Sequence, residues 1–387
     1  MKHIALMICA LAILAGGVQA KPAPEWLRQA EVYAINYANW NDDRYREVSS
    51  LPFVIMNHDR AAIDKLHKMG VRVICYVTFY QMPPNSKYQN ANIAEHPEWP
   101  QITEDGKRMF SIFSKPEGEP DNNPGWLAVC RNSPGYWRSA VAYTKYLMKS
   151  GVDGIFIDNV INDTRECHGP KFGKHQHIYP DKNYVQVNTE LFKVLRSEIK
   201  RFGNDKVLLL NTDTQRPEWA DACDGQMLES YICTWAQKVR RHDAATLLSF
   251  SHDLSPITSK GCAILALSYP GYTKFSKRED AFYCYAWSRL SGFLWTDWFN
   301  GDRSSVTLLK LGLGKPLGAM KTGDGYYSRK FEKGLVVVTS ENRGASISLS
   351  AKDYPSLYDA FEGRCLKPDA LGSYLIKLEP GQGRVFL

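Results

Sequence analysis

Two carboxylates stand where apolar runs of the sequence end, and such residues can perform acid, base or nucleophilic chemistry. Asp158 closes the run GVDGIFIDN (151–159), and Glu229 closes the run DGQMLESY (224–231). Side chains of a strand alternate between its faces, so Asp158 and Asp153 point to opposite sides. Burying a carboxylate is costly unless it is paired or used. We therefore expect Asp153 to cap the turn that leads into the strand, and Asp158 to have a chemical role.

Glycoside hydrolysis is the reaction that such a pair of acids supports best. One carboxylate attacks the anomeric carbon or activates water, and the other, held protonated, gives its proton to the leaving oxygen. Asp213 and Asp297 are rival candidates for the acid/base because they also follow apolar runs. An alternative for Glu229 is a structural salt bridge to a loop arginine such as Arg216.

Aromatic and polar residues at the ends of the same runs favour a polyol substrate. Flat apolar rings stack on sugars, while a few polar groups fix the orientation of a ligand. Tyr269 and Asn39 also occupy run ends. The residues predicted to contact the substrate are Trp40, His58, Asp59, Tyr80, Asn159, Asn211, Asp213, Tyr231, Trp295 and Asp297.

Other chemistries lack their motifs. There is no GxSxG elbow, no lysine at a strand end for a Schiff base, and no glycine-rich nucleotide loop. The loop CHGPKFGKHQH (167–177) holds three histidines near Cys167, but its spacing matches no usual structural zinc site. We therefore expect no metal and no cofactor. A metal-dependent hydrolase would instead require a His/Asp cluster inside the mouth of the fold.

The elements that must position these residues form a repeating pattern. Apolar runs alternate with helical patterns through the first 300 residues, which indicates a parallel sheet covered on both faces. Ser133-Pro134 starts one predicted helix and Gly203 stops another, whereas the connection 41–50 is too short for a full helix. Eight alternations predict a (β/α)8 TIM barrel over residues 21–318, with its active site at the carboxyl ends of the strands. The eight runs are 31–40, 51–59, 71–80, 151–159, 206–213, 224–231, 262–270 and 292–300.

Both ends of the chain differ from the barrel. Residues 319–387 read as short strands separated by turns, which predicts a small C-terminal antiparallel β-sandwich domain. Residues 1–20 have the basic, apolar and small-residue regions of a signal peptide, so we expect cleavage after Ala20 and a secreted or periplasmic protein. No later segment is apolar enough for stable membrane insertion.

Cysteine content and charge add two expectations. Eight cysteines follow the predicted signal peptide, and in an oxidising compartment we expect disulfides, with Cys130–Cys167 the favoured pair. The formal net charge is +7, without a basic stripe or reader motif, so no nucleic-acid partner is expected. We expect a monomer whose partner is a polysaccharide or oligosaccharide.

The run GVDGIFIDN resembles the nucleophile strand of glycoside-hydrolase-like barrels of the α-galactosidase/α-amylase type and of the endo-α-1,4-polygalactosaminidase group. The segments AEHPEWPQITEDGKRM (94–109), NSPGYWRSAV (132–141) and PGQGRVFL (380–387) extend the resemblance over most of the chain. The resemblance implies a retaining enzyme for α-linked sugars, with Asp158 as nucleophile and Glu229 as general acid/base.

This chain departs from both patterns at the acid/base. The α-amylase pattern places an acid at the end of the fifth strand, where this chain has Asn211-Thr212-Asp213. The α-galactosidase pattern usually has Asp, not Glu, after the sixth strand. This departure leaves the acid/base assignment more open than that of the nucleophile. The alternative function, from another class, is a catalytically inactive carbohydrate-binding barrel.

Overall fold

The computed structural model describes residues 21–387 except 84–86, 89–90, 93–94, 113, 115–124, 161–164, 234–240, 272 and 298–305. The predicted signal peptide, residues 1–20, lies outside the described residues.

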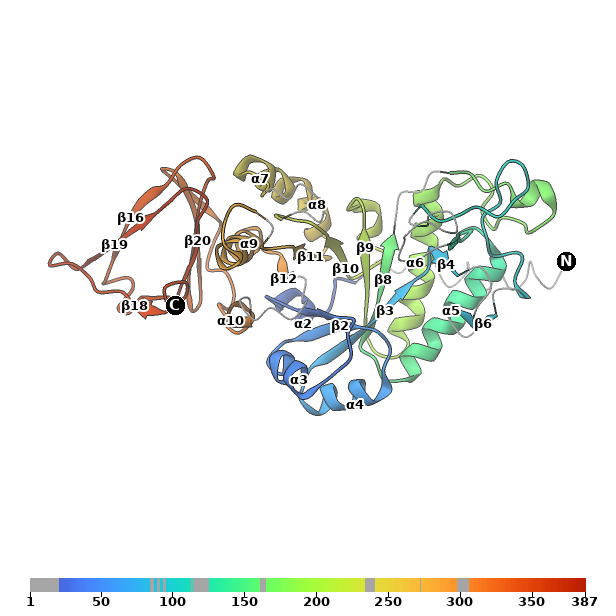
Figure 1. The fold of residues 1–387 in the computed structure, drawn as a ribbon, viewed down its shortest axis with the longest axis horizontal. Helices are drawn as coiled ribbons and strands as arrows, with labels where there is room; N and C mark the ends of the chain where they lie inside the picture. Colours follow the sequence, from blue (N-terminus) through green and yellow to red (C-terminus); the bar gives the residue numbers. More distant parts are fainter. Residues whose placement is uncertain are drawn as a thin grey trace.

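Eight parallel strands form one sheet in the order in which they occur along the chain (Figure 1). Its first and last strands meet, because the amide of Tyr33 donates to Trp295 O at 3.2 Å and the amide of Trp295 donates to Glu31 O at 2.9 Å. The sheet therefore closes into the predicted (β/α)8 barrel. Its strands are β1 (Ala34–Asn36), β2 (Phe53–Met56), β3 (Arg72–Thr78), β8 (Gly154–Val160), β9 (Val207–Thr212), β10 (Gly225–Leu228), β11 (Ala263–Ser268) and β12 (Leu294–Asp297).

Helices lie between these strands, including a short one in the connection 41–50. This connection, expected to be too short for a full helix, holds the two-turn helix α3 (Asp42–Val48), whose first turn is capped by the Asn41 side chain accepting from Arg44 N at 2.9 Å. The other helices are α2 (Glu25–Gln29), α4 (Arg60–Lys68), α5 (Pro134–Lys149), α6 (Tyr184–Lys200), α7 (Ala244–Asp253), α8 (Ser255–Thr258), α9 (Lys277–Ser291) and α10 (Val306–Leu309).

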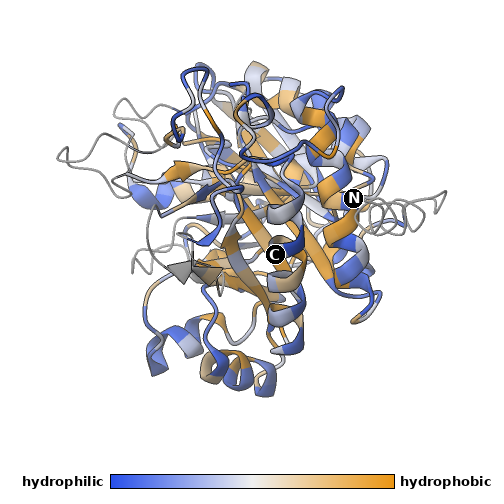
Figure 2. Ribbon diagram, turned by 90° about the vertical axis from the view of Figure 1, so that its right-hand side faces the viewer, coloured by the Kyte–Doolittle hydropathy of each residue, from blue (hydrophilic) through white to orange (hydrophobic). Residues whose placement is uncertain are grey.

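The predicted start signal of α5 acts as expected. Pro134 occupies the first turn and the Ser133 side chain accepts from Tyr136 N at 3.4 Å. Figure 2 shows apolar residues concentrated on the strands and on helix faces turned towards them. None of the helices among the described residues is both long and apolar enough to cross a bilayer.

A long excursion leaves the barrel between β3 and α5. It contains the short antiparallel strands β4 (Gln81–Met82), β5 (Lys87–Tyr88), β6 (Ala91–Asn92) and β7 (Leu127–Ala128), with β4 paired to β7 and β5 to β6. The excursion starts at the carboxyl end of β3, so it belongs to the same end of the barrel as the strand-end residues. These strands were not predicted from the sequence.

The C-terminal residues form a separate pair of sheets, at the left of Figure 1. The larger sheet comprises β13 (Lys321–Gly323), β14 (Tyr326–Phe331), β15 (Gly334–Thr339), β20 (Gly383–Phe386), β17 (Tyr358–Asp359) and β18 (Arg364–Cys365); the smaller pairs β16 (Ala345–Ser350) with β19 (Ser373–Leu378). A second apolar core, which includes Val337, Ile347 and Ile376, lies between them. The predicted boundary at residues 318/319 falls between α10 and β13.

The β-domain packs directly on α9. A Cβ atom added at Gly383 of β20 would lie 2.7 Å from Tyr283 Cα, so only glycine permits this approach. Arg241 also links the two parts: its Nε donates to the buried Asp280 at 2.7 Å, and its Nη1 donates to Gly381 O. The contact therefore combines close backbone packing with a hydrogen bond from an arginine that the ion pair with Asp280 holds in place.

Two buried aspartates stabilise the amino-terminal end of the barrel. Asp153 accepts from Lys206 Nζ at 2.8 Å, from Val73 N at 2.9 Å and pairs with His67 Nε2 at 2.8 Å. Asp224 accepts similarly from Leu208 N at 2.9 Å and from Arg196 at 2.8 Å. Burial tends to raise the pKa of Asp153, but the bonds from Lys206 and Val73 outweigh it, so the pKa is lowered. The predicted turn cap is therefore the centre of a buried ion-pair network joining β3, β8, β9 and α4.

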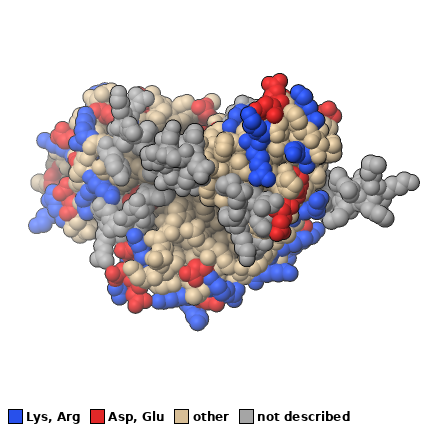
Figure 3. Space-filling view, turned by 45° about the vertical axis from the view of Figure 1, so that its right-hand side comes forward, with Lys and Arg blue, Asp and Glu red and all other residues tan. Residues whose placement is uncertain are grey.

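The described surface carries both signs of charge side by side. In Figure 3, lysine and arginine side chains lie among aspartate and glutamate side chains around the periphery of the visible face. Such a mixed surface is typical of an ordinary globular protein.

Candidate active site

Asp158 and Glu229 meet at the carboxyl ends of their strands, joined by one amide. Asn211 Nδ2, from the end of β9, donates to Asp158 Oδ1 at 2.8 Å and to Glu229 Oε2 at 2.7 Å. The two accepting oxygens are therefore no further apart than these lengths combined, 2.8 plus 2.7, or 5.5 Å. The two acids predicted from the sequence thus share one site.

A tyrosine holds each carboxylate from the other side. Tyr76 of β3 donates its hydroxyl to Asp158 Oδ2 at 2.7 Å, and Tyr269, just after β11, donates to Glu229 Oε1 at 2.6 Å. All four carboxylate oxygens therefore accept a hydrogen bond. The five side chains come from β3, β8 and β9 and from the residues that follow β10 and β11, so closure of the barrel is what assembles them.

Alternation along the strands explains why these side chains meet. Register pairs Tyr76 with Phe156 and Phe156 with Leu209, which places Tyr76, Asp158 and Asn211 on one face of the sheet. That face is the barrel interior. A Cβ at Gly154, on the same face, would lie 2.3 Å from Val207 O, so the strands pack closely beneath the acids.

The backbone turns sharply after each acid. Asn159 has φ 57° and Ser230 has φ 60°, and these are the two non-glycine residues with positive φ among those the structure describes. Asparagine tolerates this left-handed region, whereas serine pays a steric cost there. The pairing of β8 with β9 also shifts register between Ile157 and Val160. Backbone strain of this kind tends to occur at functional sites.

The two acids differ in burial, and burial affects the pKa of Asp158. Burial raises the pKa of Asp158, hydrogen bonds from Tyr76 and Asn211 oppose the rise, and the neighbouring Glu229 adds to it. Asp158 is half-buried, whereas Glu229 is exposed. Burial and the charge of Glu229 also raise the pKa of Tyr269, which keeps its hydroxyl protonated as a donor.

Tyr37 and Tyr76 are site residues that the sequence analysis missed. Their rings lie 4.7 Å apart, and burial together with Asp158 raises the pKa of Tyr37. Tyr76 sits two residues before the end of β3, and the predictions considered only strand ends. Alternation along the strand could have identified Tyr76, since it places this residue on the same face as the inward-facing residues.

Several predicted residues lie near the acids or remain accessible. Asn211 binds both acids directly, and Asn159 provides the turn after Asp158. Asp213 is exposed beyond the end of β9. Trp40, after β1, is half-buried and stacks on Tyr45 with ring centroids 4.9 Å apart.

Other predicted sugar contacts have structural partners instead. His58 hydrogen-bonds Ser150 Oγ at 3.0 Å next to α5, and Asp59 caps α4 by accepting from Ala62 N at 3.1 Å. Tyr80 is buried and donates to Asn188 of α6 at 3.3 Å. Tyr231 is buried and meets Ser291 Oγ at 2.9 Å. Tyr80 and Tyr231 are thus directed into the packing around the barrel, whereas the half-buried His58 and the exposed Asp59 bond to helix ends.

The last strand contributes no accessible group. Trp295 is fully buried against Tyr285 of α9, with ring centroids 5.6 Å apart, so it faces outwards. Asp297 is 2% exposed, which leaves a rival acid out of solvent. The alternative salt bridge from Glu229 to Arg216 is not formed among the described residues: Glu229 is hydrogen-bonded to Asn211 and Tyr269, and the Arg216 guanidinium lies 5.6 Å from the Trp219 ring centroid.

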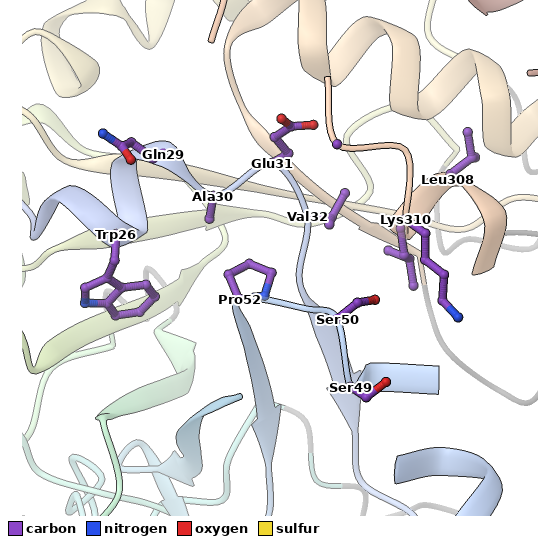
Figure 4. A pocket seen from close by; sticks show the side chains of 12 residues that line it. Trp26, Gln29, Ala30, Glu31, Val32, Ser49, Ser50, Pro52, Leu308 and Lys310 are labelled. Atoms are coloured by element: carbon purple, nitrogen blue, oxygen red, sulfur yellow. The ribbon is translucent and has the colours of Figure 1, made fainter. Parts of the chain in front are cut away.

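A cavity of about 430 Å³ lies at the opposite end of the barrel (Figure 4). It is lined by residues that precede β1 and β2, such as Glu31 and Pro52, and by Leu308, Leu309, Lys310 and Gly312. Its Glu31 carboxylate already accepts from Leu313 N at 3.0 Å. Because active sites of such barrels lie at the carboxyl ends of the strands, we do not assign the chemistry to this cavity.

The expected disulfides are not present among the described cysteines, all eight of which are free. Cys130 and Cys167 do lie close together, as the prediction required, but His175 and His177 share the position with them. This group contains neither acid. The other buried pairs, Cys223–Cys262 and Cys233–Cys284, have sulfur atoms 3.7 and 3.6 Å apart.

The Tyr76 hydroxyl provides a direct test of the Asp158 electrostatics. In Tyr76→Phe, Asp158 loses a hydrogen bond that stabilises its ionised form, so its pKa should rise further. If ionised Asp158 is required, activity is lost as pH falls through that pKa, and the acid limb of kcat/KM should move to higher pH. At neutral pH we expect a loss of about tenfold.

The pH profile of kcat/KM for wild type and variant measures this shift. Tyr285→Phe is a matched control, because it removes a buried tyrosine hydroxyl that lies 3.4 Å from Glu31, away from the acid pair. An unmoved acid limb in Tyr76→Phe would contradict the assignment of that limb to Asp158.

The sequence and the fold are similar to those of known proteins. The model of the family described as hypothetical glycosyl hydrolase family 15 (GHL15) matches residues 71–335. No curated protein matched the sequence. Among solved structures, the α-amylase of Geobacillus thermoleovorans superposes with a TM-score of 0.57 at 12% identity, covering 94% of this chain and 98% of that one.

Two further structures share the architecture. A debranching enzyme of Nostoc punctiforme has a TM-score of 0.57 at 11% identity, covering 95% of this chain and 99% of its own. A β-L-arabinopyranosidase of Geobacillus stearothermophilus has a TM-score of 0.53 at 10% identity, covering 94% and 97%. At these identities the likeness concerns the fold.

Proposed function

Because the chain belongs to hypothetical glycosyl hydrolase family 15, whose model spans most of its barrel, we propose that it hydrolyses an α-linked polysaccharide or oligosaccharide with retention of configuration. Asp158 is the nucleophile and Glu229 the general acid/base. The observation that carries the proposal is the shared Asn211 amide. Retaining enzymes separate their carboxyl groups by about 5–5.5 Å and inverting enzymes by about 6.5–9.5 Å. The bound of 5.5 Å between the facing oxygens favours retention.

The first step forms a covalent bond to Asp158. One of its oxygens attacks the anomeric carbon as the glycosidic C–O bond breaks, and protonated Glu229 transfers its proton to the leaving oxygen. The bonds from Tyr76 and Asn211 hold the nucleophile in orientation. In the second step Glu229 removes a proton from water, the water oxygen attacks the same carbon, and Asp158 leaves as a carboxylate.

The partners of Glu229 suit a group that alternates between two protonation states. The Asn211 Nδ2 group can only donate, so Oε2 must remain an acceptor. The Tyr269 hydroxyl can donate or accept, so it can turn when Oε1 carries the proton. We infer that the proton delivered to the leaving oxygen resides on Oε1. The exposure of Glu229 gives water and the leaving group access to it.

Two further parts of the proposal, an α-linked substrate and export of the protein, are supported by different observations. The resemblance of GVDGIFIDN to α-glycosidase nucleophile strands supports an α-linked sugar, and similar folds occur in an α-amylase and a debranching enzyme. The signal pattern in residues 1–20 supports action outside the cytoplasm.

Proton NMR of the first product formed tests the mechanism. The mature chain is incubated with a panel of α-linked polysaccharides, and the anomeric signals are followed before mutarotation. We expect the α-anomer to appear first. Initial formation of the β-anomer would contradict retention. Measurable binding of a polysaccharide without hydrolysis by wild type would instead favour the inactive carbohydrate-binding barrel.

A further inference from the structure

We propose that Cys130, Cys167, His175 and His177 together bind one zinc ion as a structural site. Their ligand atoms all lie within 4.8 Å of one another. The four residues come from two segments 37 or more positions apart, one just before α5 and one in the loop between β8 and α6. Zn²⁺ prefers four sulfur and nitrogen ligands, and two cysteines with two histidines is one of its usual structural sets.

The sulfur–nitrogen distances fit tetrahedral coordination. Cys167 Sγ lies 3.5 Å from His175 Nε2, and Cys130 Sγ lies 3.6 Å from His177 Nε2. With Zn–S about 2.3 Å and Zn–N about 2.0–2.1 Å, a tetrahedral site has a sulfur–nitrogen edge of about 3.6 Å. These two sulfur–nitrogen distances therefore match the edge of a tetrahedral zinc site, and the other ligand atoms lie within 4.8 Å of one another.

The surroundings favour zinc over other cations and over a catalytic metal. Cys130, Cys167 and His175 are buried and His177 is half-buried. The group has no carboxylate, whereas Ca²⁺ and Mg²⁺ require oxygen ligands. Four protein ligands leave no open position for substrate, which is typical of a structural site.

The chain around the four side chains is shaped to bring them together. A Cβ atom at Gly169 would lie 2.3 Å from His175 Cε1 and 2.5 Å from Nε2, so glycine makes room for this imidazole ring. The amide of Ile102 donates to Cys167 Sγ at 3.4 Å, and the amide of His168 donates to Ile102 O at 2.8 Å. An amide donor to sulfur stabilises the thiolate, the form that binds metals.

The ion would fix a loop that follows the nucleophile strand. Residues Cys167–His177 lie between β8, which carries Asp158, and α6, while Cys130 precedes the cap of α5. Zinc would thus join this loop to the end of the excursion that follows β3. The inference does not depend on the glycosidase proposal, because it concerns residues outside the acid pair.

Metal analysis of the purified full chain without an affinity tag tests the inference. We expect about one zinc per chain, since the four ligands form a single closed site. Co²⁺ exchanged into the protein should give thiolate-to-cobalt charge-transfer absorption and the visible bands of a tetrahedral ion. Cys167→Ser and His175→Ala should lower the zinc content at least tenfold, whereas the matched control Cys365→Ser removes an exposed cysteine and should keep it.

Gly169→Ala tests the geometry without removing a ligand. The added methyl displaces the His175 ring, so we expect zinc to be lost at lower chelator concentrations than in wild type. This readout and the cobalt spectrum of wild type remain decisive if a ligand variant fails to fold. Zinc-free protein that does not take up cobalt, or peptide mapping that shows a Cys130–Cys167 disulfide, would overturn the proposal.

Discussion

Asp158→Asn is expected to abolish turnover, with kcat/KM reduced by about 10⁴-fold or more, as when other covalent enzymes lose their nucleophile. The replacement keeps the size of the side chain but removes the anionic oxygen that would attack the sugar. Asp158 is half-buried and its two oxygens are held by Tyr76 and Asn211, so no other described acid occupies its position. Initial rates on the best substrate of the panel measure the effect.

Asp153→Asn is the matched control for this change. It makes the same chemical substitution on the same segment, but at the amino-terminal end of the barrel, where Asp153 pairs with Lys206 and His67. It should lower thermal stability and leave the kcat of the folded protein near wild type. If Asp158→Asn stays within tenfold of wild type while circular dichroism shows it folded, the nucleophile assignment is wrong.

Glu229→Gln is expected to reduce activity by about 10²–10⁴-fold on a natural glycoside, because a positioned general acid contributes that much. The loss should depend on the leaving group. An aryl glycoside with an acidic phenol needs little proton transfer to leave, so formation of the glycosyl-enzyme should remain fast on that substrate. Hydrolysis of the intermediate should then become slow, because the variant has no base for water.

Pre-steady-state kinetics with the two substrates separate these steps. We expect a burst of phenol from the variant, equal to about one equivalent of enzyme, followed by slow turnover. Asp213→Asn, which alters the rival acid, should show no such dependence on the leaving group. An equal loss on both substrates without a burst would mean that Glu229 binds substrate and does not transfer protons.

The sequence sufficed for the barrel and for its acid pair. Parallel strands covered on both faces are nearly continuous apolar runs, and all eight appear in the structure. Alternation along the strands, together with the location of barrel active sites at the carboxyl ends of the strands, then indicated Asp158 and Glu229. The connection 41–50, expected to be too short for a full helix, holds the seven-residue helix α3, because one good cap is enough for two turns there.

For the remaining site residues, the direction of each side chain decides whether it reaches the site, and the pattern of residue types along the sequence does not determine that direction. Ser230 has a left-handed backbone, which ends the alternation after Glu229 and turns Tyr231 towards Ser291 instead of the sugar. Trp295 lies on a short strand whose facing is set by the closure with Val32. Tyr76 was missed because a long side chain can reach the site from two residues before a strand end.

The candidate metal ligands illustrate a second limit. Patterns of zinc ligands are recognised by local spacing, but Cys130 and His177 are 47 positions apart and meet only through the fold. The spacing of residues 167–177 considered alone therefore argued against a metal. The expected Cys130–Cys167 pairing was a correct inference about proximity and an incorrect one about bonding.

The left-handed turns after the two acids imply a trade-off between thermal stability and catalysis. The left-handed conformation costs a residue such as Ser230 roughly 1–2 kcal/mol and Asn159 less, and both turns lie beside the reacting groups. The ion-paired aspartates that strengthen the barrel lie at its other end, around Asp153 and Asp224. Selection for heat resistance alone should therefore relax the backbone at residues 159 and 230 and release the acids, whereas strengthening the opposite end would leave the chemistry intact.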